Sequence, residues 1–550
     1  MQAVVGVSRL GQRLTSRSRW QEARAFDWSR TCRLLFVFCA AALATACASL
    51  PSQGERPVSV AIEGSSGTSL GRIALASAPE RDLSGFRLMP SGAFALSARM
   101  ELARRAEKSL DVQYFLIRHD ATGKAMLRAL RDAALRGVRV RLLLDDLYTS
   151  GQDELLSGLA AHENVEVRLF NPFPTRGGLL SRFALSLPNV ERLNHRMHNK
   201  LFIADGAMAV TGGRNVADEY FSRHPLANFI DLDLFVSGAV VPELGRLFDL
   251  YWNSALAYPL GSVVPPRLTR PELRAGFEEV SRPSAPPVTH EPDTRDVLGY
   301  RPIEEELDAG TLDLIWDYAE ASADMPSKGE APPPGLEEAS IASNRVRVSV
   351  VEHMREAKSE VMLVSPYFVP GRSGMDLIKD LRSREVKVGV LTNSLASTDQ
   401  PLVHSGYRRY RRSLLELGVD VYELSPIKAG REGRGLLFGK SVGGLHSKAI
   451  VFDNLEVFIG SMNFDPRSDH YNTEIGLFIH SPRLTLQVAR LARLAQRQAS
   501  HRLQLTAGGA LEWITPGGAD DEVHTKEPEA KLWMRYLLEL LAPLAPEGML

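Results

Sequence analysis

Cysteine is nearly absent from this chain. Of its 550 residues only three are cysteine, and Cys32, Cys39 and Cys47 all lie within the first 47 positions. The rest of the chain therefore folds without a disulfide and offers neither a cysteine nucleophile nor a cysteine ligand for a metal. Any function that depends on a thiol must belong to the N-terminal segment.

An excess of positive charge is missing as well. The formal net charge of the whole chain is −1. The first 46 residues contain seven arginines and two acidic residues, so the chain without them carries a formal charge of −6. Proteins that bind nucleic acid in bulk neutralise its phosphates with a basic surface. We therefore expect no nucleic-acid partner.

The N-terminal segment also lacks an apolar run long enough to span a bilayer. Residues 34–46 carry no charge, whereas a spanning helix needs about 20 apolar residues. The run follows an arginine-rich stretch and ends in an Ala-Thr-Ala tripeptide directly before Cys47. This pattern resembles a bacterial lipoprotein signal, although Leu43 stands one place too early. The alternative interpretation is an uncleaved membrane anchor.

The lipoprotein interpretation has consequences for the first 83 residues. Residues 1–46 are then a signal segment, Cys47 is lipidated, and residues 47–83 form a tether that contains Ser, Gly and Pro. Under either interpretation we expect membrane association. The lipoprotein interpretation places the protein in a bacterial cell envelope, facing the periplasm.

One short pattern occurs twice in the chain. Each copy reads H-x-K-x4-D and is followed by a glycine-containing turn and an asparagine. Every member of the second copy lies 248 positions after its counterpart in the first. The members are His198, Lys200, Asp205 and Asn215 in the first copy, and His446, Lys448, Asp453 and Asn463 in the second. Two copies in register indicate an internal duplication with one composite site.

The pattern also indicates how its side chains are presented. In an extended strand successive side chains alternate between faces, so the His and the Lys of each copy lie on the same side. The residues that follow, 201–203 and 449–452, are apolar and favour strands. We therefore predict a buried strand of an α/β sheet at each copy.

Two imidazoles, two ammonium groups and two amides suit the chemistry of a phosphodiester. One His can attack phosphorus while the other protonates the leaving oxygen, because histidine titrates near neutrality. The Lys and Asn side chains can stabilise the charge that grows on the phosphoryl oxygens. This chemistry demands no metal ion and no other cofactor.

Each histidine needs a partner that orients its second ring nitrogen. In each half one carboxylate stands shortly before an apolar run: Asp231 after the first motif and Glu474 after the second, with Asp233 as the rival in the first half. The motif aspartates Asp205 and Asp453 belong to the signature and to the candidate catalytic set. Their place at the end of an apolar run predicts that they hold backbone rather than substrate.

These residues resemble the phospholipase D superfamily, whose signature is the duplicated H-x-K-x4-D. The resemblance is greatest to the bacterial branch that includes cardiolipin synthase C. It begins near residue 84, continues to the C-terminus, and rests on the motifs and on residues 192–200, 391–396, 403–407 and 460–468.

The resemblance implies a duplicated α/β/α sandwich with pseudo-twofold halves and an active site at their interface. It implies a covalent phosphohistidine, with His198 as nucleophile and His446 as general acid. It also implies phosphate-binding roles for both Lys, both Asn and Ser461. Gly213 takes the place of Ser461 in the first half, so a hydroxyl contact exists on one side only.

The domain organisation follows from the duplication. We predict a first half at residues 84–260, a proline-rich connecting segment at 261–345, a second half at 346–485 and a helical extension at 486–550. Within the connecting segment we expect one helix near residues 312–320.

Three segments mix apolar and basic residues. Residues 177–183 and 435–440 precede the two motifs and suit either a lipid-facing rim or a plug of their own core. The basic run at 408–412 suits anionic headgroups, although a solvated helix face explains it better. The apolar helix expected at residues 532–541 either docks on the body or lies on a membrane.

The leading functional hypothesis is a phosphatidyltransferase that makes cardiolipin from phosphatidylglycerol and phosphatidylethanolamine. The first alternative is a phospholipase D-type hydrolase that releases phosphatidic acid. A nuclease is disfavoured by the acidic charge, and a catalytically dead lipid-binding lipoprotein is disfavoured by two intact motifs.

Overall fold

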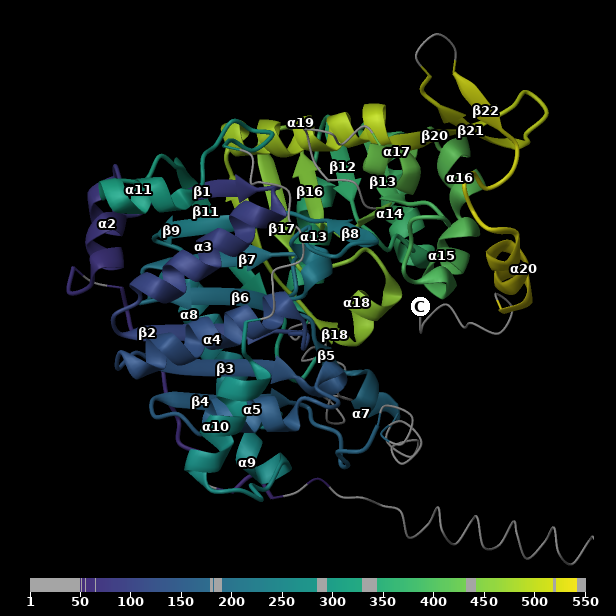
Figure 1. Cartoon of the computed structure of the whole chain (residues 1–550). Helices are drawn as coiled ribbons and strands as arrows, with labels where there is room; N and C mark the ends of the chain where they lie inside the picture. Colours follow the sequence, from purple (N-terminus) through teal and green to yellow (C-terminus); the bar gives the residue numbers. More distant parts are fainter. Residues whose placement is uncertain are drawn as a thin grey trace, which may run out of the picture. The chain divides into compact units, whose positions relative to one another are not determined.

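Two sheets with the same strand order form the framework of the chain, which we describe from a computed structural model (Figure 1). The structure describes residues 50, 52–54, 56–64, 66–178, 182, 190–283, 294–328, 344–431, 442–517 and 521–541. In each sheet three parallel strands are followed by an antiparallel strand that carries the Lys of one motif. The predicted duplicated α/β fold is confirmed.

The strands of the first half pair in a continuous series. Its order is β10 (Ala257–Pro259), β4 (Val165–Phe170), β3 (Arg139–Asp145), β2 (Ser109–Tyr114), β6 (Lys200–Ala204), β7 (Met208–Gly212), β9 (Asp233–Gly238) and β1 (Ser84–Met89). The inner strands are buried on both faces, as expected for a sheet covered by helices.

The second half repeats this series and extends it. Its order is β19 (Ile475–His480), β17 (Glu456–Gly460), β16 (Ala449–Phe452), β12 (Glu360–Val364), β13 (Lys387–Asn393), β14 (Asp420–Leu424), β20 (Ser500–Leu505), β21 (Leu511–Thr515) and β22 (Glu522–His524). The last three strands occupy the region for which a helical extension was predicted. That prediction is wrong beyond α19 (Pro482–Ala499).

A single strand joins the two sheets edge to edge. The first residues of β11 (Ile315–Ala323) pair with β1, and its remaining residues pair with β19. The helix predicted near residues 312–320 is therefore wrong. Alanine and glutamate in this segment favour a helix, but two open sheet edges offer its backbone hydrogen bonds on both sides, and that tertiary pairing outweighs local propensity.

Helices cover both sheets and share a central layer. On the outer face of the first sheet, α3 (Gly92–Arg105), α4 (Ala121–Leu135) and α5 (Asp153–Ala160) pack, and α13 (Arg345–Glu356) and α14 (Gly371–Ser383) pack on the outer face of the second. Between the sheets, α8 (Val241–Trp252) and α19 contribute to one apolar cluster that includes strand residues of both halves. This shared core holds the two halves in a defined relationship.

The amphipathic pattern of each helix explains its burial. In α4 the buried residues Met126, Leu127 and Leu130 recur at helical spacing, and Asp120 caps the helix by accepting from Gly123 N. In the connecting segment, α10 (Arg270–Val280) and α11 (Ile303–Ala309) also pack on the first half, through residues such as Phe277 and Leu307.

The predicted tether is a packed part of the first half. Residues Leu70 and Ile73 of α2 (Ser69–Ser77) are buried in its core. Upstream, Ala61 N donates to Asp249 Oδ2 at 2.7 Å, and Arg168 Nη2 donates to Pro57 O at 2.8 Å. Backbone capture by buried side chains makes this segment part of the fold. The signal segment and Cys47 lie outside the described residues.

The last described helix is α20 (Leu532–Leu541). Its Leu538 is buried against Leu395, so the helix docks on the second half. Its Leu532, Trp533, Tyr536 and Leu540 are exposed. Among the residues that the structure describes, no helix has the length and apolar character needed to cross a bilayer.

Candidate active site

Two small parallel sheets, each built from both halves, carry the catalytic histidines. In one, β5 (Arg196–Met197) pairs with β18 (Asn472–Thr473); in the other, β15 (Val442–Leu445) pairs with β8 (Ala227–Ile230). Each histidine follows the last residue of one of these strands and donates its backbone N–H to the other half. His198 N donates to Thr473 O at 2.9 Å, and His446 N donates to Ile230 O at 2.7 Å.

The orienting carboxylates cross between the halves. Glu474 Oε2 lies 2.9 Å from His198 Nδ1, and Asp231 Oδ2 lies 2.5 Å from His446 Nδ1. The sequence indicated both carboxylates but did not show that each serves the histidine of the opposite half. A carboxylate on Nδ1 fixes the tautomer in which Nε2 has a free lone pair.

Asp233, the rival candidate in the first half, does not contact a catalytic histidine. It is fully buried and forms ion pairs with Arg99 at 2.8 Å and with Arg214 at 3.4 Å. Arg99 Nε in turn donates to Tyr114 Oη. Asp233 therefore neutralises buried arginines of its own half.

Ser461 does not serve the phosphate-binding role predicted for it. Its hydroxyl donates to Glu474 Oε2 and accepts from Ile475 N at 3.0 Å. Because its one proton is given to the carboxylate, it has none to offer a phosphoryl oxygen. Ser468 Oγ donates to the other carboxylate oxygen of Glu474 at 2.9 Å, so two hydroxyls hold the residue that orients His198.

Gly213, the counterpart of Ser461, is required by the shorter carboxylate of the first half. A Cβ atom at this position would lie 2.0 Å from Asp231 Oδ1. The carboxyl group of Asp231 therefore occupies the space that a side chain at position 213 would fill. The departure from the second-half pattern follows from the exchange of glutamate for aspartate.

The lysines and asparagines line the same site. Lys200 and Lys448 are buried, and each donates to the backbone oxygen of the histidine two residues before it. The amide Oδ1 atoms of Asn215 and Asn463 are buried and have no hydrogen-bond partner among the described residues. Asn215 Nδ2 donates to Tyr220 Oη at 3.1 Å.

Aromatic rings form walls beside the histidines, and the sequence did not indicate them. The Phe115 ring lies 5.0 Å from the His198 ring, and the rings of Tyr220 and Phe229 lie 5.0 and 5.2 Å from the His446 ring. Phe115 also lies 5.4 Å from Lys200 Nζ. These rings exclude water and lower the local dielectric, which strengthens charge interactions inside the site.

Burial controls the protonation of the site. It lowers the pKa of His198 to about 4, although the charge of Glu474 opposes the shift. It also lowers the pKa of His446 and reduces that of Lys448 to about 8. The unliganded site therefore holds neutral imidazoles at neutral pH, the form in which a histidine acts as a nucleophile.

The motif aspartates bind backbone at the far end of their strands. Asp205 accepts from the N–H groups of residues 107–109, and Asp453 accepts from those of residues 358–360. Both lie five residues beyond the motif Lys, so their inclusion in the catalytic set is corrected. They fix the start of β2 and β12, as their position in the sequence predicted.

The other predicted surface features are partly described. The rim segments fall mainly on residues 179–181, 183–189 and 432–441, which lie outside the described residues. Within the basic run, Arg411 is buried and pairs with Glu423 and Glu527 at 2.7 and 2.6 Å. The run is therefore partly an internal ion-pair network.

Comparison with known proteins places this site in a family. The profile of the family described as "Cardiolipin synthase, PLD-like domain" matches residues 100–237 and 350–494, the two halves described above. Over 467 residues the chain is 37% identical to cardiolipin synthase C of Escherichia coli (strain K12), covering 83% of this chain and 94% of that protein. The chain belongs to the cardiolipin synthase family of phospholipase D-like proteins.

Further relatives of the cardiolipin synthase family show how far the likeness extends. Cardiolipin synthase 1 of Staphylococcus aureus (strain MRSA252) is 25% identical over 383 residues, which cover 69% of this chain and 61% of that protein. Among solved structures, phosphatidylserine synthase of Haemophilus influenzae Rd KW20 covers 85% of this chain and 95% of its own, with a TM-score of 0.54 and 13% identity. That last likeness concerns the fold alone.

Proposed function

We propose that this protein is a membrane-associated phosphatidyltransferase that makes cardiolipin through a phosphohistidine intermediate. The observation that carries the proposal is the crossed pair of histidines, His198 with Glu474 and His446 with Asp231, in one site with two lysines and two asparagines. Family membership supports the same assignment.

In the first step His198 acts as the nucleophile. Its Nε2 lone pair attacks phosphorus of a phospholipid, while the Nδ1 proton stays on Glu474 and disperses the charge that develops on the ring. The P–O bond to the headgroup breaks, and His446 gives its proton to the leaving oxygen. Substrate binding prepares His446 for this role, because an anionic phosphodiester raises the pKa of a neighbouring imidazole.

In the second step the roles of His446 reverse. Its imidazole takes the proton of an acceptor hydroxyl, whose oxygen attacks phosphorus and displaces His198. Lys200 and Lys448 stabilise the negative charge on the phosphoryl oxygens in both steps. The amide N–H groups of Asn215 and Asn463 can serve the same oxygens.

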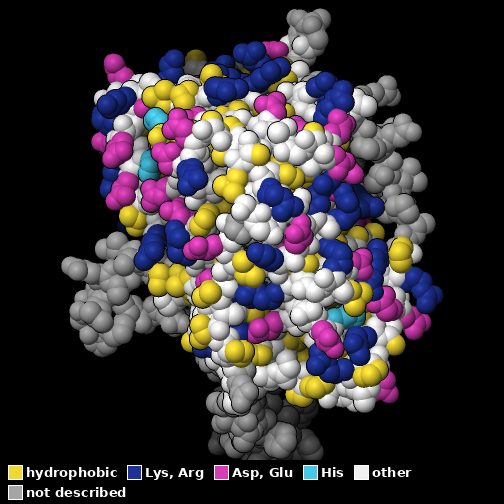
Figure 2. All heavy atoms as spheres, turned by 90° about the vertical axis from the view of Figure 1, so that its left-hand side faces the viewer, with side chains coloured by type: hydrophobic (Ala, Val, Ile, Leu, Met, Phe, Trp, Pro, Cys, Tyr) yellow, Lys and Arg dark blue, Asp and Glu magenta, His cyan; other side chains and the backbone are white. Residues whose placement is uncertain are grey.

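The acceptor follows from the setting of the enzyme. A membrane-associated site meets lipid hydroxyls at high local concentration, and its aromatic walls disfavour water. We therefore assign phosphatidylethanolamine or phosphatidylglycerol as donor and phosphatidylglycerol as acceptor. Nucleic acid is not a proposed substrate; on the face seen in Figure 2, acidic and basic side chains are interspersed among apolar ones.

The test uses purified enzyme and vesicles of phosphatidylethanolamine and phosphatidylglycerol. Cardiolipin should exceed phosphatidic acid among the products, and a small primary alcohol should divert product to the phosphatidyl alcohol. Exclusive formation of phosphatidic acid, insensitive to alcohol and to phosphatidylglycerol, would favour the hydrolytic alternative. A plasmid-nicking assay checks the nuclease alternative.

We also propose that Cys47 carries the membrane anchor on the periplasmic side of the cell envelope. The support is the small-residue tripeptide before Cys47 and the charge-free run before that. Cys47→Ser should abolish lipid labelling and, where cleavage after Ala46 persists, release the protein from membranes. Unchanged membrane association with an uncleaved N-terminus would favour the anchor alternative.

A further inference from the structure

The third strand of each half ends directly beside the residue that precedes a catalytic histidine. β3 ends at Asp145 and β13 at Asn393, and these positions are 248 apart, the same offset that separates the two histidines. Asp145 Oδ2 accepts from Met197 N at 2.9 Å. Asn393 Oδ1 accepts from Leu445 N at 2.8 Å, and its Nδ2 donates to Leu445 O at 2.9 Å.

We propose that Asp145 and Asn393 are positioning residues, each acting on one step of the reaction through one histidine. Met197 immediately precedes His198, and Leu445 immediately precedes His446. Each clamp therefore sets the backbone that aims an imidazole, whereas the crossed carboxylate sets the rotation of the ring. This inference rests on the proposed phosphohistidine mechanism.

Asp145 has a hydrogen-bonding pattern that only a carboxylate satisfies. It accepts from Leu147 N on Oδ1 at 2.8 Å and from Met197 N on Oδ2, with Arg196 Nη1 3.4 Å from Oδ1. An asparagine has one accepting oxygen, so one of these N–H groups would face an NH₂ group. Asp145 is 1% exposed, and water cannot replace the lost partner freely.

Asn393 has the opposite requirement. Its NH₂ group faces two carbonyl oxygens, those of Leu445 at 2.9 Å and of Pro366 at 3.3 Å. Its oxygen accepts from Leu445 N and from Ser397 Oγ at 3.0 Å. A carboxylate here would place negative charge against both carbonyls. The two halves thus solve the same positioning task with residue types that cannot be exchanged.

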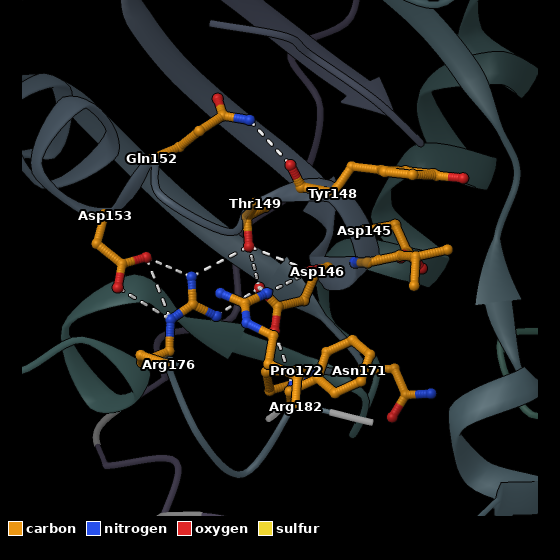
Figure 3. Close-up of polar contacts among 12 residues, drawn as sticks. Asp145, Asp146, Tyr148, Thr149, Gln152, Asp153, Asn171, Pro172, Arg176 and Arg182 are labelled. Carbon is orange, nitrogen blue, oxygen red and sulfur yellow. Dashed lines mark hydrogen bonds and ion pairs between the residues drawn. The ribbon is translucent and has the colours of Figure 1, made fainter. Parts of the chain in front are cut away.

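The surroundings of Asp145 keep it in place. Its neighbour Asp146 accepts from Arg176 at 2.6 Å and from Phe173 N at 2.7 Å, and Arg182 donates to the Asp146 backbone oxygen at 3.1 Å (Figure 3). Arg176 also pairs with Asp153 on the outer side of this network. Asp153 contacts neither Asp145 nor Met197 in this network, which makes it a matched control.

The test compares two leaving groups in single turnovers of the full-length enzyme. One substrate is a p-nitrophenyl phosphodiester, whose leaving nitrophenolate needs no protonation; the other is a phospholipid, whose leaving alkoxide does. Asp145→Asn should slow both reactions alike, by about 10- to 100-fold, because it misplaces the nucleophile. Asn393→Asp should slow only the phospholipid reaction, as His446→Ala should.

Asp153→Asn should leave both rates unchanged, and thermal unfolding shows whether each variant is folded. If Asn393→Asp or Asp145→Asn does not fold, Asn393→Ser and Asp145→Ser replace them, since a hydroxyl keeps one contact of each clamp. Equal loss on both substrates for the Asn393 variants, or unchanged rates for the Asp145 variants, overturns the inference. A wild-type enzyme that yields phosphatidic acid overturns the transferase assignment instead and leaves the leaving-group comparison intact.

Discussion

His198 Nδ1 lies 2.9 Å from Oε2 of Glu474, a residue that follows it by 276 positions. His446 and Asp231 repeat the arrangement in the opposite direction along the chain. Because each histidine depends on a carboxylate from the other half, neither half contains a complete catalytic unit. The docking of the halves is therefore part of the catalytic apparatus, and the shared core that contains α8 and α19 maintains it.

The crossed pairing predicts which variants behave alike. Glu474→Gln should lower the rate of phosphohistidine formation about 10- to 100-fold, because it loses the charge that stabilises the His198 ring. The effect of Glu474→Gln should be much smaller in a His198→Ala background, since residues that act as a unit are not additive. Single-turnover rates of all three variants provide the double-mutant cycle; additive losses would contradict the pairing.

Gly213 should tolerate no side chain. Gly213→Ala places a Cβ 2.0 Å from Asp231 Oδ1, so the carboxyl group must leave His446. We expect the rate of phospholipid turnover to fall at least about tenfold. Gly178 is the control, because a Cβ there meets no atom within 4 Å, and Gly178→Ala should keep full activity. Normal turnover by Gly213→Ala would contradict the explanation given for this glycine.

Asp231 and Asp233 should differ in what they support. Asp233→Asn leaves the buried Arg99 and Arg214 without a counter-charge and should lower the free energy of unfolding by about 3–5 kcal/mol. Asp231→Asn should cost less stability, because its neutral imidazole partner remains hydrogen-bonded, yet it should abolish most activity. Denaturant unfolding and turnover, measured on both variants, check this; the reverse ranking would be the contrary result.

The pH dependence should reflect the lowered pKa values of the site. As pH falls toward about 4, His198 gains a proton and loses its nucleophilic lone pair, so kcat/KM should decline on the acid side. As pH rises past about 8, Lys448 loses its charge and phosphate binding weakens. Lys448→Arg should move the alkaline limb upward, because arginine stays protonated. An unmoved limb would assign it to another group.

Chelators should not inhibit the reaction. The positive charge that the phosphoryl oxygens need is supplied by Lys200 and Lys448, which are both buried in the site. Turnover measured before and after treatment with EDTA, and again after adding Mg²⁺ or Ca²⁺, should be the same. A reversible loss on chelation would show that the lysines do not carry this charge alone.

Local features of the sequence predicted the parts of the site but not all of their contacts. Period-two alternation predicted the strands that present Lys200 and Lys448, and the position of Asp205 predicted its backbone contacts. The position of Ser461 suggested a phosphate contact because its partner Glu474 was unknown. The segment at β11 was assigned to a helix because the sheet edges that pair with it lie far away in the chain.

The constant offset of 248 contained one unused signal. Applied to Asp145, it leads to Asn393, and both stand at the end of a strand before a motif. The sequence alone shows no reason to join either residue to a histidine, since Asp145 and Met197 are 52 positions apart.

The sequence by itself determined that the protein is duplicated, that each half presents one His, Lys and Asn, and that Asp231 and Glu474 were the carboxylates to consider. These properties depend on residue type and short-range spacing, which the chain states directly. Only the tertiary structure decided that each carboxylate serves the opposite histidine and that Ser461 holds Glu474. Such contacts arise when two separately folded surfaces meet, so their partners depend on the orientation of the halves rather than on any local pattern.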